Sequence, residues 1–352
     1  EERLQEAGLD TAVEGFSYDV RPALRAMRMV LVVGASLVAW AGAVAADHPA
    51  VSAALLAAVL FPGAGFLAWS PWLGVLYRRD GPTQTANVVG RRRAEAPTCT
   101  VIVMAHHDSK SQSLSLPYRV GLTAAAIAGA LGVLAVLVSA AVGSPLTAGG
   151  LLAPWSGVVA GCALLVLSTI RSGNLSPGGV DNAGSLAVLL ALARSLPSRV
   201  PAGVELLFLS TGAEEDLMVG AVRWLDAHAA DLEGRPVWCL NLDGVGAPGR
   251  AVLIERYGLG RLFSKELSAA ARRAAAGLGL RPRGILMLPG LGIDAIPFAH
   301  RGVPCLTLAS GSLGRATMSV HSARDVPEHL DGDTLASMAR LAQETIVEVV
   351  GE

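Results

Sequence analysis

The chain has 352 residues, of which 52% are hydrophobic and only 16% are charged. Its mean hydropathy of +0.49 is too high for an ordinary soluble enzyme and indicates a membrane protein. The net charge of −1 provides no concentrated basic face, so no nucleic-acid partner is expected. The four cysteines are far apart and form no CxxC pair, which predicts neither a disulfide framework nor a cysteine zinc site.

Four segments are long and apolar enough to cross a bilayer core, which takes about 20 helical residues. They are residues 29–46, 50–77, 120–143 and 151–170. Pro62 and Pro71 interrupt the second segment, which predicts a kink or an early end. Burial of these helices in a large soluble core is the alternative. It is disfavoured because each span has arginine at only one end, as membrane anchoring requires.

The arginines that flank the spans also predict the topology. The opposite connections, "DHPA" and "SPLTAGG", contain neither lysine nor arginine. By the positive-inside rule, both termini and everything outside the two hairpins lie in the cytoplasm. We therefore expect a multi-pass protein of the plasma membrane, in contact with the lipid bilayer. The flanking arginines are Arg21, Arg25, Arg28, Arg78, Arg79, Arg119 and Arg171.

The extramembrane residues are numerous enough for one domain of about 200 residues. The sequence thus predicts three regions. Residues 1–79 form an N-terminal segment with the first transmembrane hairpin, and residues 119–171 form a second hairpin. Residues 80–118 and 172–352 form one domain, which this second hairpin splits.

Strand and helix patterns alternate in the extramembrane part. "ANVVGRR" and "CTVIVMA", separated by a polar "RAEAP", predict a hairpin, and "VELLFLS", "PVWCLNLD" and "PCLTLA" predict buried strands. Helical patterns cover residues 183–194, after an Asp181-Asn182 cap, and residues 216–229, 262–276 and 335–350. This order predicts an α/β fold with a mixed, mostly parallel sheet covered by helices, in addition to four transmembrane α-helices.

Each predicted strand end carries a carboxylate or an imidazole, and sites in α/β sheets collect at the carboxyl ends of strands. Taken singly, an Asp-Asn before a helix is usually an N-cap, and a Glu-Glu pair is usually a solvated helix start. Five successive loops that offer nitrogen and oxygen ligands without a thiolate instead favour a two-metal zinc site with one shared carboxylate. The residues in these loops are His106, His107, Asp108, Asp181, Glu214, Glu215, Asp243, His321 and Asp325.

The order of these motifs resembles that of the zinc-dependent aminopeptidases of the bacterial leucyl aminopeptidase type, which are related to glutamate carboxypeptidase and glutaminyl cyclase. The resemblance runs from "NVVGRR" to "HSARDVPEHLD" and includes "GIDAIPFAHRGVP", which contains Asp294. It implies two Zn²⁺ ions per chain, with Asp181 as the bridging ligand. One ion would also take His106 and Asp243, and the other would take Glu215 and His321.

The same resemblance implies catalytic roles for Glu214 and Asp108. Glu214 matches the general base, and Asp108 matches the carboxylate that orients His106 by a hydrogen bond to its far ring nitrogen. Zinc lowers the pKa of bound water to about 7, so Glu214 can take a proton and return it to the leaving amine. We expect a zinc-dependent metallopeptidase, an aminopeptidase-like hydrolase of peptide or amide substrates. His107 is expected to be a spacer or pocket residue rather than a ligand, and His228, His300 and His329 are expected to be structural.

Three other functions compete with this interpretation. A glutaminyl cyclase-like acyltransferase shares "HHDSK" and "DAIPF", but Asn182 follows Asp181 as in the hydrolases, and "SVHSARD" lacks the tryptophan that cyclases place before their final histidine. An inactive membrane scaffold has no need to keep five ionisable groups together. A serine hydrolase or one-zinc protease is disfavoured because the sequence has no GxSxG or HExxH motif.

The second hairpin fills the gap between His106 and Asp181, where the family normally has a short loop. Residues 109–118 and 172–180 alone connect the site to the spans. Even fully extended, either connection reaches only about 30 to 36 Å. We therefore expect the metal centre near the bilayer surface. The helices then either deliver a membrane-associated substrate or serve only as an anchor.

Overall fold

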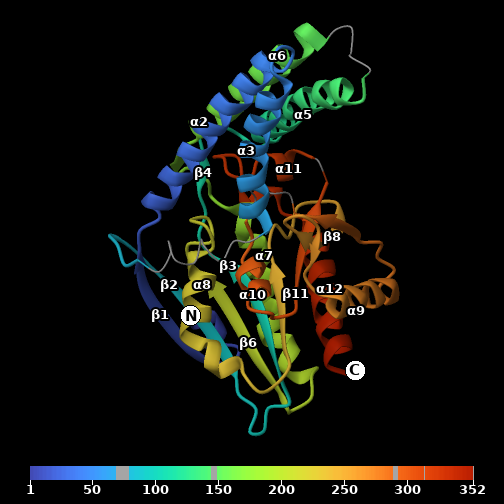
Figure 1. Cartoon of the computed structure of the whole chain (residues 1–352). Helices are drawn as coiled ribbons and strands as arrows, with labels where there is room; N and C mark the ends of the chain where they lie inside the picture. Colours follow the sequence, from blue (N-terminus) through green and yellow to red (C-terminus); the bar gives the residue numbers. More distant parts are fainter. Residues whose placement is uncertain (69–78, 144–148, 288–291, 313, 352) are drawn as a thin grey trace. The chain divides into compact units, whose positions relative to one another are not determined.

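The computed structural model of the chain describes residues 1–68, 79–143, 149–287, 292–312 and 314–351 (Figure 1). The chain forms two compact units. The first, here called the sheet unit, comprises Glu1–Val20, Pro71–Ser111 and Asn174–Glu352. The second, here called the helical unit, comprises Arg21–Ser70 and Gln112–Gly173.

A mixed nine-stranded sheet forms the centre of the sheet unit. Its order is β1-β2-β6-β3-β7-β11-β8-β10, and β9 pairs with β8. The four strands β6, β3, β7 and β11 run parallel to one another, whereas β2 joins β6 and β8 joins β11 in antiparallel fashion. The strands are β1 (Asp10–Tyr18), β2 (Thr83–Arg92), β3 (Cys99–His106), β6 (Val204–Thr211), β7 (Val237–Leu242), β8 (Arg250–Tyr257), β9 (Arg261–Leu262), β10 (Arg283–Leu286) and β11 (Cys305–Gly311).

Helices cover both faces of this sheet, which confirms the predicted fold class (Figure 1). On one face, α7 (Gly184–Ser195), α9 (Lys265–Gly277) and α12 (Gly332–Gly351) bury apolar side chains such as Leu189, Leu267 and Leu341. On the other face, α8 (Val219–His228) and α10 (Ala295–His300) bury Trp224 and Phe298. The shorter elements are α1 (Glu2–Gln5), η1 (Gly179–Ala183), η2 (Leu196–Ser198), η3 (Ala229–Leu232), α11 (Arg315–Met318) and η4 (Pro327–His329).

The predicted hairpin between "ANVVGRR" and "CTVIVMA" is wrong, because β6 lies between these two strands. Leu209 of β6 faces Val89 of β2 on one side and Met104 of β3 on the other. All eight residues of β6 are buried, as expected for a strand with neighbours at both edges and helices on both faces. β2 is partly exposed and therefore suits a position nearer the sheet edge.

The remaining predicted strands and helices are present, with shifted ends. α8 begins at Val219 rather than 216 because Leu217 and Met218 have left-handed φ angles of 75° and 62°. α9 begins at Lys265 rather than 262 because the Ser264 hydroxyl caps it by accepting from the Leu267 N–H at 3.1 Å. Strand β1 was not predicted, yet it pairs with β2 along all nine of its residues.

The helical unit contains α2 (Arg21–Val44), α3 (Pro49–Ala68), α5 (Leu116–Ala141) and α6 (Gly149–Ser168). Four spans were predicted. In the described part of the chain, three helices are long and apolar enough to cross a membrane, namely α2, α5 and α6. The other predicted span, residues 50–77, overlaps α3, whose segment Pro49–Phe61 is apolar but shorter than a membrane span. Residues 69–77 of this span lie outside the described residues.

Small residues allow two helices of this unit to approach closely. A Cβ atom on Gly42 of α2 would lie 2.5 Å from the carbonyl oxygen of Ala153 in α6. A Cβ atom on Gly157 of α6 would lie 2.8 Å from the carbonyl oxygen of Val38 in α2. Glycine is needed at both positions, as at the interfaces of membrane helix pairs.

The second hairpin closes on itself where it starts and ends. The two-residue strands β4 (Ser111–Gln112) and β5 (Ser172–Gly173) pair with each other. Beside them, the Ser113 N–H donates to the Arg171 carbonyl oxygen at 2.9 Å. The Arg171 N–H donates in return to the Ser113 hydroxyl at 3.0 Å. Ser113, which lies shortly before this hairpin, and Arg171, its last residue, are therefore hydrogen-bonded neighbours.

Candidate metal centre

Five of the predicted site residues lie together at one edge of the sheet. His106 ends β3, Glu215 follows β6, Asp243 follows β7 and His321 follows β11, while Asp181 lies in η1. Because these four strands are parallel, their carboxyl ends meet at the same edge. The five residues form two groups that share Asp181, with possible ligand atoms within 4.8 Å of one another in each group. These groups are His106, Asp181, Asp243 and Asp181, Glu215, His321.

The two carboxylate oxygens of Asp181 face different histidines. Oδ1 lies 3.1 Å from Nε2 of His106, and Oδ2 lies 3.0 Å from Nε2 of His321. Nε2 of His321 also lies 3.0 Å from Oε1 of Glu215, and Nε2 of His106 lies 3.8 Å from Oδ1 of Asp243. In both groups, a ring nitrogen and two carboxylates therefore converge.

A divalent cation fits this donor set. Nε2 of His106 is fully buried and, within the described residues, makes no hydrogen bond, although the Asp181 oxygen is only 3.1 Å away. Close approach without hydrogen-bond geometry is expected when two ligands point at a common centre rather than at each other. Imidazole nitrogens with carboxylate oxygens, and no thiolate, suit Zn²⁺.

Charge balance in the groups supports the same conclusion. Burial alone would lower the pKa of both histidines, but the facing carboxylates outweigh it. They raise the pKa of His106 well above its usual value and that of His321 to about 9. Burial acts to raise the pKa of Asp181, yet the attraction of the two facing histidines, when they are protonated, lowers it far below normal. Protons on the histidines thus balance carboxylate charge that a cation would otherwise balance.

Glu214 lies beside the two groups without belonging to either. It is only 8% exposed, and burial, with help from the carboxylates of Asp243 and Asp294, raises its pKa well above the usual value. Asp294 is itself buried, which raises its pKa to about 7, and one of its oxygens accepts a short hydrogen bond from the Thr211 hydroxyl. A raised pKa brings the titration of a glutamate side chain closer to neutral pH, where the side chain can both accept and return a proton.

Asp108 holds the site differently from the expected arrangement. The Nδ1 atom of His106 donates to the main-chain carbonyl oxygen of Asp108 at 3.0 Å, whereas the carboxylate oxygen is 3.7 Å away. A neutral His106 ring therefore presents its Nε2 lone pair to the site. The Asp108 carboxylate instead accepts the N–H groups of Glu214 at 3.0 Å and Glu215 at 3.1 Å.

Asp325 performs an equivalent function for the Asp181 loop. It is fully buried, and its two carboxylate oxygens accept the N–H groups of Val180 at 2.8 Å and Asp181 at 3.2 Å. Its main-chain carbonyl accepts the Gly179 N–H at 2.9 Å. Asp325 is one of the predicted strand-end residues and lies four residues after His321, but no role was predicted for it. Its position in "HSARD" was the available indication.

The predicted Asp181-Asn182 helix cap is wrong. Helix α7 starts at Gly184, and no side chain caps its first turn. The Asn182 amide instead donates to the Leu242 carbonyl oxygen at 3.1 Å, and its oxygen accepts the Gly244 N–H at 3.2 Å. Asn182 thereby holds the backbone on both sides of Asp243, so its side chain serves the site rather than the helix.

The turn that carries Glu214 and Glu215 contains three residues with left-handed backbone angles, namely Ala213, Leu217 and Met218. Each such non-glycine residue costs about 1 to 3 kcal/mol and persists only when its surroundings fix it. Lys110 is one such fixing contact. Its ammonium group donates a short hydrogen bond to the Glu215 carbonyl oxygen and lies 3.1 Å from Oε2 of the same residue.

Four other histidines contact residues outside the two groups. His107 is hydrogen-bonded to the Ser210 hydroxyl at 2.9 Å, and His329 to the Ser319 hydroxyl at 3.2 Å. His228 pairs with Glu14 and Asp231, and the His300 ring packs 5.6 Å from that of Tyr257.

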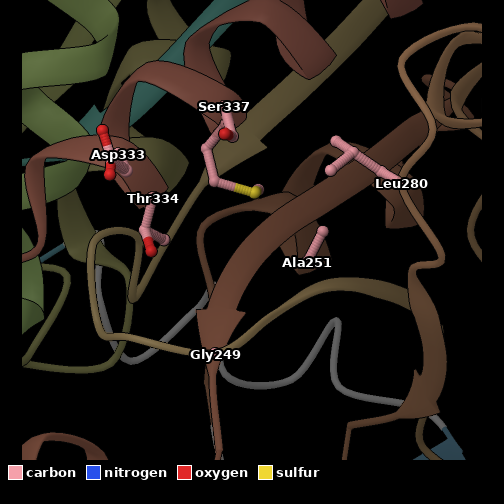
Figure 2. A pocket seen from close by; sticks show the side chains of 7 residues that line it. Gly249, Ala251, Leu280, Asp333, Thr334 and Ser337 are labelled. Atoms are coloured by element: carbon pink, nitrogen blue, oxygen red, sulfur yellow. The ribbon is translucent and has the colours of Figure 1, made fainter.

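A small hollow of about 160 Å³ beside α12 contains none of the candidate site residues (Figure 2). Its lining comes from β8, the loops near it and the start of α12. The lining residues are Gly249, Ala251, Leu280, Asp333, Thr334, Ser337 and Met338.

Several solved structures resemble this fold. The zinc aminopeptidase of Bacillus subtilis is 20% identical with a TM-score of 0.51, over 77% of this chain and 50% of that one. LapB from Legionella pneumophila is 11% identical with a TM-score of 0.52, over 100% and 81%. The glutaminyl cyclase of Porphyromonas gingivalis is 19% identical with a TM-score of 0.45, over 76% and 77%. The chain thus spans about half the length of the Bacillus subtilis enzyme.

Sequence comparison is more specific than the likeness of folds. No curated protein matches the chain. The sequence pattern described as Peptidase family M28 matches residues 164–346, which include Asp181, Glu214, Glu215, Asp243 and His321. Because the match covers more than half of the chain, the protein belongs to peptidase family M28.

Proposed function

We propose that this protein is a membrane-embedded metallopeptidase with two zinc ions, which hydrolyses an amide bond as an aminopeptidase. The observation that carries the proposal is the position of Asp181, whose two oxygens lie 3.1 Å and 3.0 Å from different histidines. A carboxylate in this position is the bridge that a two-metal hydrolase requires. Membership in a zinc peptidase family supports the identity of the metal.

The two groups of possible ligands suggest which residues would bind each zinc ion. His106 and Asp243 would hold one zinc ion, and Glu215 and His321 the other, with Asp181 between them. Zinc, when bound, would act as a Lewis acid that polarises the amide carbonyl group, and it would lower the pKa of bound water. Glu214 takes the proton from the attacking water and delivers it to the leaving amine, for which its buried position and raised pKa are suited.

Asp108 takes part in this scheme without touching the substrate. Its carboxylate fixes the N–H groups of Glu214 and Glu215, so it sets where the base and one ligand stand. Its carbonyl oxygen fixes the His106 ring. We assign Asp108 to positioning of both groups.

The membrane setting is also a proposal. Arginines next to the apolar helices, and their absence from the opposite connections, favour a multi-pass plasma-membrane protein with both termini and the sheet unit in the cytoplasm. The partners are then the lipid bilayer and a peptide or amide substrate, which reaches the site from the membrane. The short chain connections from the metal centre to α5 and α6 support delivery from the membrane.

Metal analysis with activity measurements tests the enzymatic proposal. The full chain should bind about two zinc ions and release N-terminal residues from aminoacyl substrates. Glu214→Gln should keep the zinc and lose activity by about 10²-fold to 10⁴-fold, whereas the exposed Glu233→Gln should change neither. Cyclisation of N-terminal glutaminyl compounds would instead identify an acyltransferase. A metal-free, inactive chain would identify a scaffold.

Replacement of the second hairpin tests delivery from the membrane. A short loop in place of residues 119–171 should lower the rate on membrane-bound substrates and leave the rate on soluble substrates unchanged. Equal rates on both substrates before and after replacement would contradict delivery and leave the helices as an anchor.

A further inference from the structure

The N-terminal strand contacts the turn that carries the proposed base. Tyr18, the last residue of β1, is only 5% exposed. Its hydroxyl donates to Oδ2 of Asp216 at 2.7 Å. Asp216 directly follows Glu215, so the contact lies one residue from a proposed zinc ligand and two residues from the proposed base. Tyr18 itself lies outside the residues matched to the peptidase family.

This turn needs contacts from outside to keep its shape. Ala213, Leu217 and Met218, on either side of the acidic residues, have φ angles of 57°, 75° and 62°. Non-glycine residues hold such angles only when neighbouring groups leave no alternative. Asp108 and Lys110 supply such groups, and both come from the loop after β3.

Tyr18 supplies a contact from a second direction and at a different residue. A hydroxyl that donates to an ionised carboxylate makes a stronger hydrogen bond than a neutral pair does, and burial removes the competition of water. Burial, followed by the bond to Asp216, raises the pKa of Tyr18 above its ordinary value, so the hydroxyl remains a donor.

The end of β1 is itself firmly held. The Ser17 carbonyl oxygen accepts from the Arg223 guanidinium of α8 at 2.9 Å, and the same guanidinium nitrogen lies 2.9 Å from Asp80. A Cβ atom on Gly81 would lie 2.4 Å from the Tyr18 carbonyl oxygen, so the returning chain packs directly against this strand end. The backbone of Tyr18 is therefore held in place, so its hydroxyl can fix the position of the Glu214-Glu215 turn.

We propose that Tyr18 is a positioning residue that holds the Glu214-Glu215 turn in its active conformation through Asp216. The proposal rests on the proposed function for its catalytic consequence. Tyr18 lies three residues before α2 begins at Arg21. The same strand therefore connects the catalytic turn to the first apolar helix, and displacement of that strand would release the turn.

Hydrogen exchange of the zinc-loaded full chain tests the proposal independently of activity. Tyr18→Phe keeps the ring and removes the donor, and amides in residues 211–218 should then exchange about 10-fold faster. Asp216→Ala should have the same effect, and the double variant should be no worse than either single variant. Asp216→Asn keeps an acceptor and should largely restore slow exchange.

Kinetics supply the second readout. Tyr18→Phe should lower kcat about 10-fold and leave KM within about twofold, because the turn carries the proposed base. The matched control is Thr11→Val, which removes a hydroxyl of the same strand that bonds to Gln5 at 2.9 Å. This control should alter neither exchange nor kcat.

Unchanged exchange in residues 211–218 of Tyr18→Phe would overturn the proposal, even if the variant melts at a lower temperature. An equal effect of Thr11→Val would also overturn it, since the strand alone would then matter. If the chain hydrolyses no amide, the proposed function fails, but the exchange result still decides whether Tyr18 holds the turn.

Discussion

The two units of this protein differ in the size of most of the apolar residues that they bury. In the sheet unit, large side chains such as Phe208, Trp224 and Phe298 are fully buried. In the helical unit, alanine and glycine lie inside, whereas Trp40 and Trp155 are 56% and 66% exposed. Water drives large apolar groups inward, while lipid does not distinguish them from their surroundings. This contrast is the one expected if the helical unit lies in lipid and the sheet unit in water, as proposed above.

The units also differ in how they use polar groups. The sheet unit concentrates buried carboxylates and imidazoles at one edge, where each needs a partner. The helical unit satisfies the buried Ser52 hydroxyl locally, by donation to the Ala41 carbonyl oxygen at 2.7 Å. Changes at the metal centre should therefore affect the chemistry and spare the helices, and changes between helices should do the reverse.

The largest effect is expected for Asp181→Ala. Loss of the shared carboxylate should remove both zinc ions and lower hydrolysis on the order of 10⁴-fold, while membrane insertion stays normal. Zinc content, activity and membrane fractionation measure the three quantities. Asp231→Ala, at an exposed carboxylate, is the control and should retain all three. Full zinc content in Asp181→Ala would contradict the bridge.

The next effect concerns pH and the sheet unit. In metal-free protein, the pKa of His321 lies near 9 rather than 6.5, so its proton stabilises the fold fully below about pH 6.5 and is lost as the pH rises through 9. Below about pH 6.5, this shift of the His321 pKa contributes on the order of 3 kcal/mol to the free energy of unfolding of the metal-free protein. Zinc requires the neutral ring, so zinc-induced stabilisation should increase from pH 6.5 to 9.

Thermal unfolding of metal-free and zinc-loaded protein at three pH values checks this. The melting temperatures of the two forms should diverge as the pH rises. The divergence should shrink in His321→Asn, which removes the titrating ring. A constant difference between the two forms across this pH range would contradict the prediction.

A smaller effect is expected for Asp325→Ala. The Val180 and Asp181 N–H groups lose their acceptor, so zinc affinity should fall about 10-fold to 100-fold. Zinc titration with a competing chelator measures the change. Asp325→Asn retains one carbonyl acceptor, so its zinc affinity should lie between that of Asp325→Ala and that of the unchanged protein. Asp333→Ala, at an exposed aspartate, should bind zinc normally. A normal zinc affinity in Asp325→Ala would mean that the Asp181 loop keeps its conformation without the Asp325 carboxylate.

The smallest effect is expected for Gly157→Leu in the helical unit. A side chain here would overlap the backbone of α2, which should lower the stability of the helical unit by about 1 to 3 kcal/mol. Zinc content of the sheet unit should not change. Gly150→Leu in the same helix has open space around its Cβ and serves as the control. Resistance to denaturant in lipid discs measures the difference, and equal behaviour of the two variants would contradict it.

Sequence was sufficient where function depends on local patterns. The strand ends that carry His106, Glu215 and Asp243 follow apolar runs, and a parallel sheet brings such ends together whatever the strand order. The apolar helices were predictable because they coincide with long runs of apolar residues in the sequence. These features predict that imidazole and carboxylate ligands collect at one edge of the sheet, whereas their division into two groups around Asp181 is what the resemblance to the zinc aminopeptidases implies.

Other features depend on contacts between distant parts of the chain. The position of β6 between β2 and β3 reflects burial on both faces, which a polar spacer such as "RAEAP" does not encode. Asn182 follows the rule for a helix cap, but tertiary hydrogen bonds to the Leu242 and Gly244 backbone outcompete that role. Tyr18 and Asp325 act through hydrogen bonds to loops that are distant in sequence, and no periodic pattern in the sequence predicts such contacts.

The closed base of the second hairpin bears on whether this segment can be exchanged. Ser113 and Arg171 are hydrogen-bonded to each other, and in the sheet unit the Leu175 N–H donates to the Ser111 hydroxyl at 3.0 Å. A segment whose two ends are neighbours can be inserted at a surface turn without moving the residues on either side of that turn. We therefore expect that the segment between Ser113 and Arg171 can be exchanged for another segment with neighbouring ends without a change in the fold of the sheet unit.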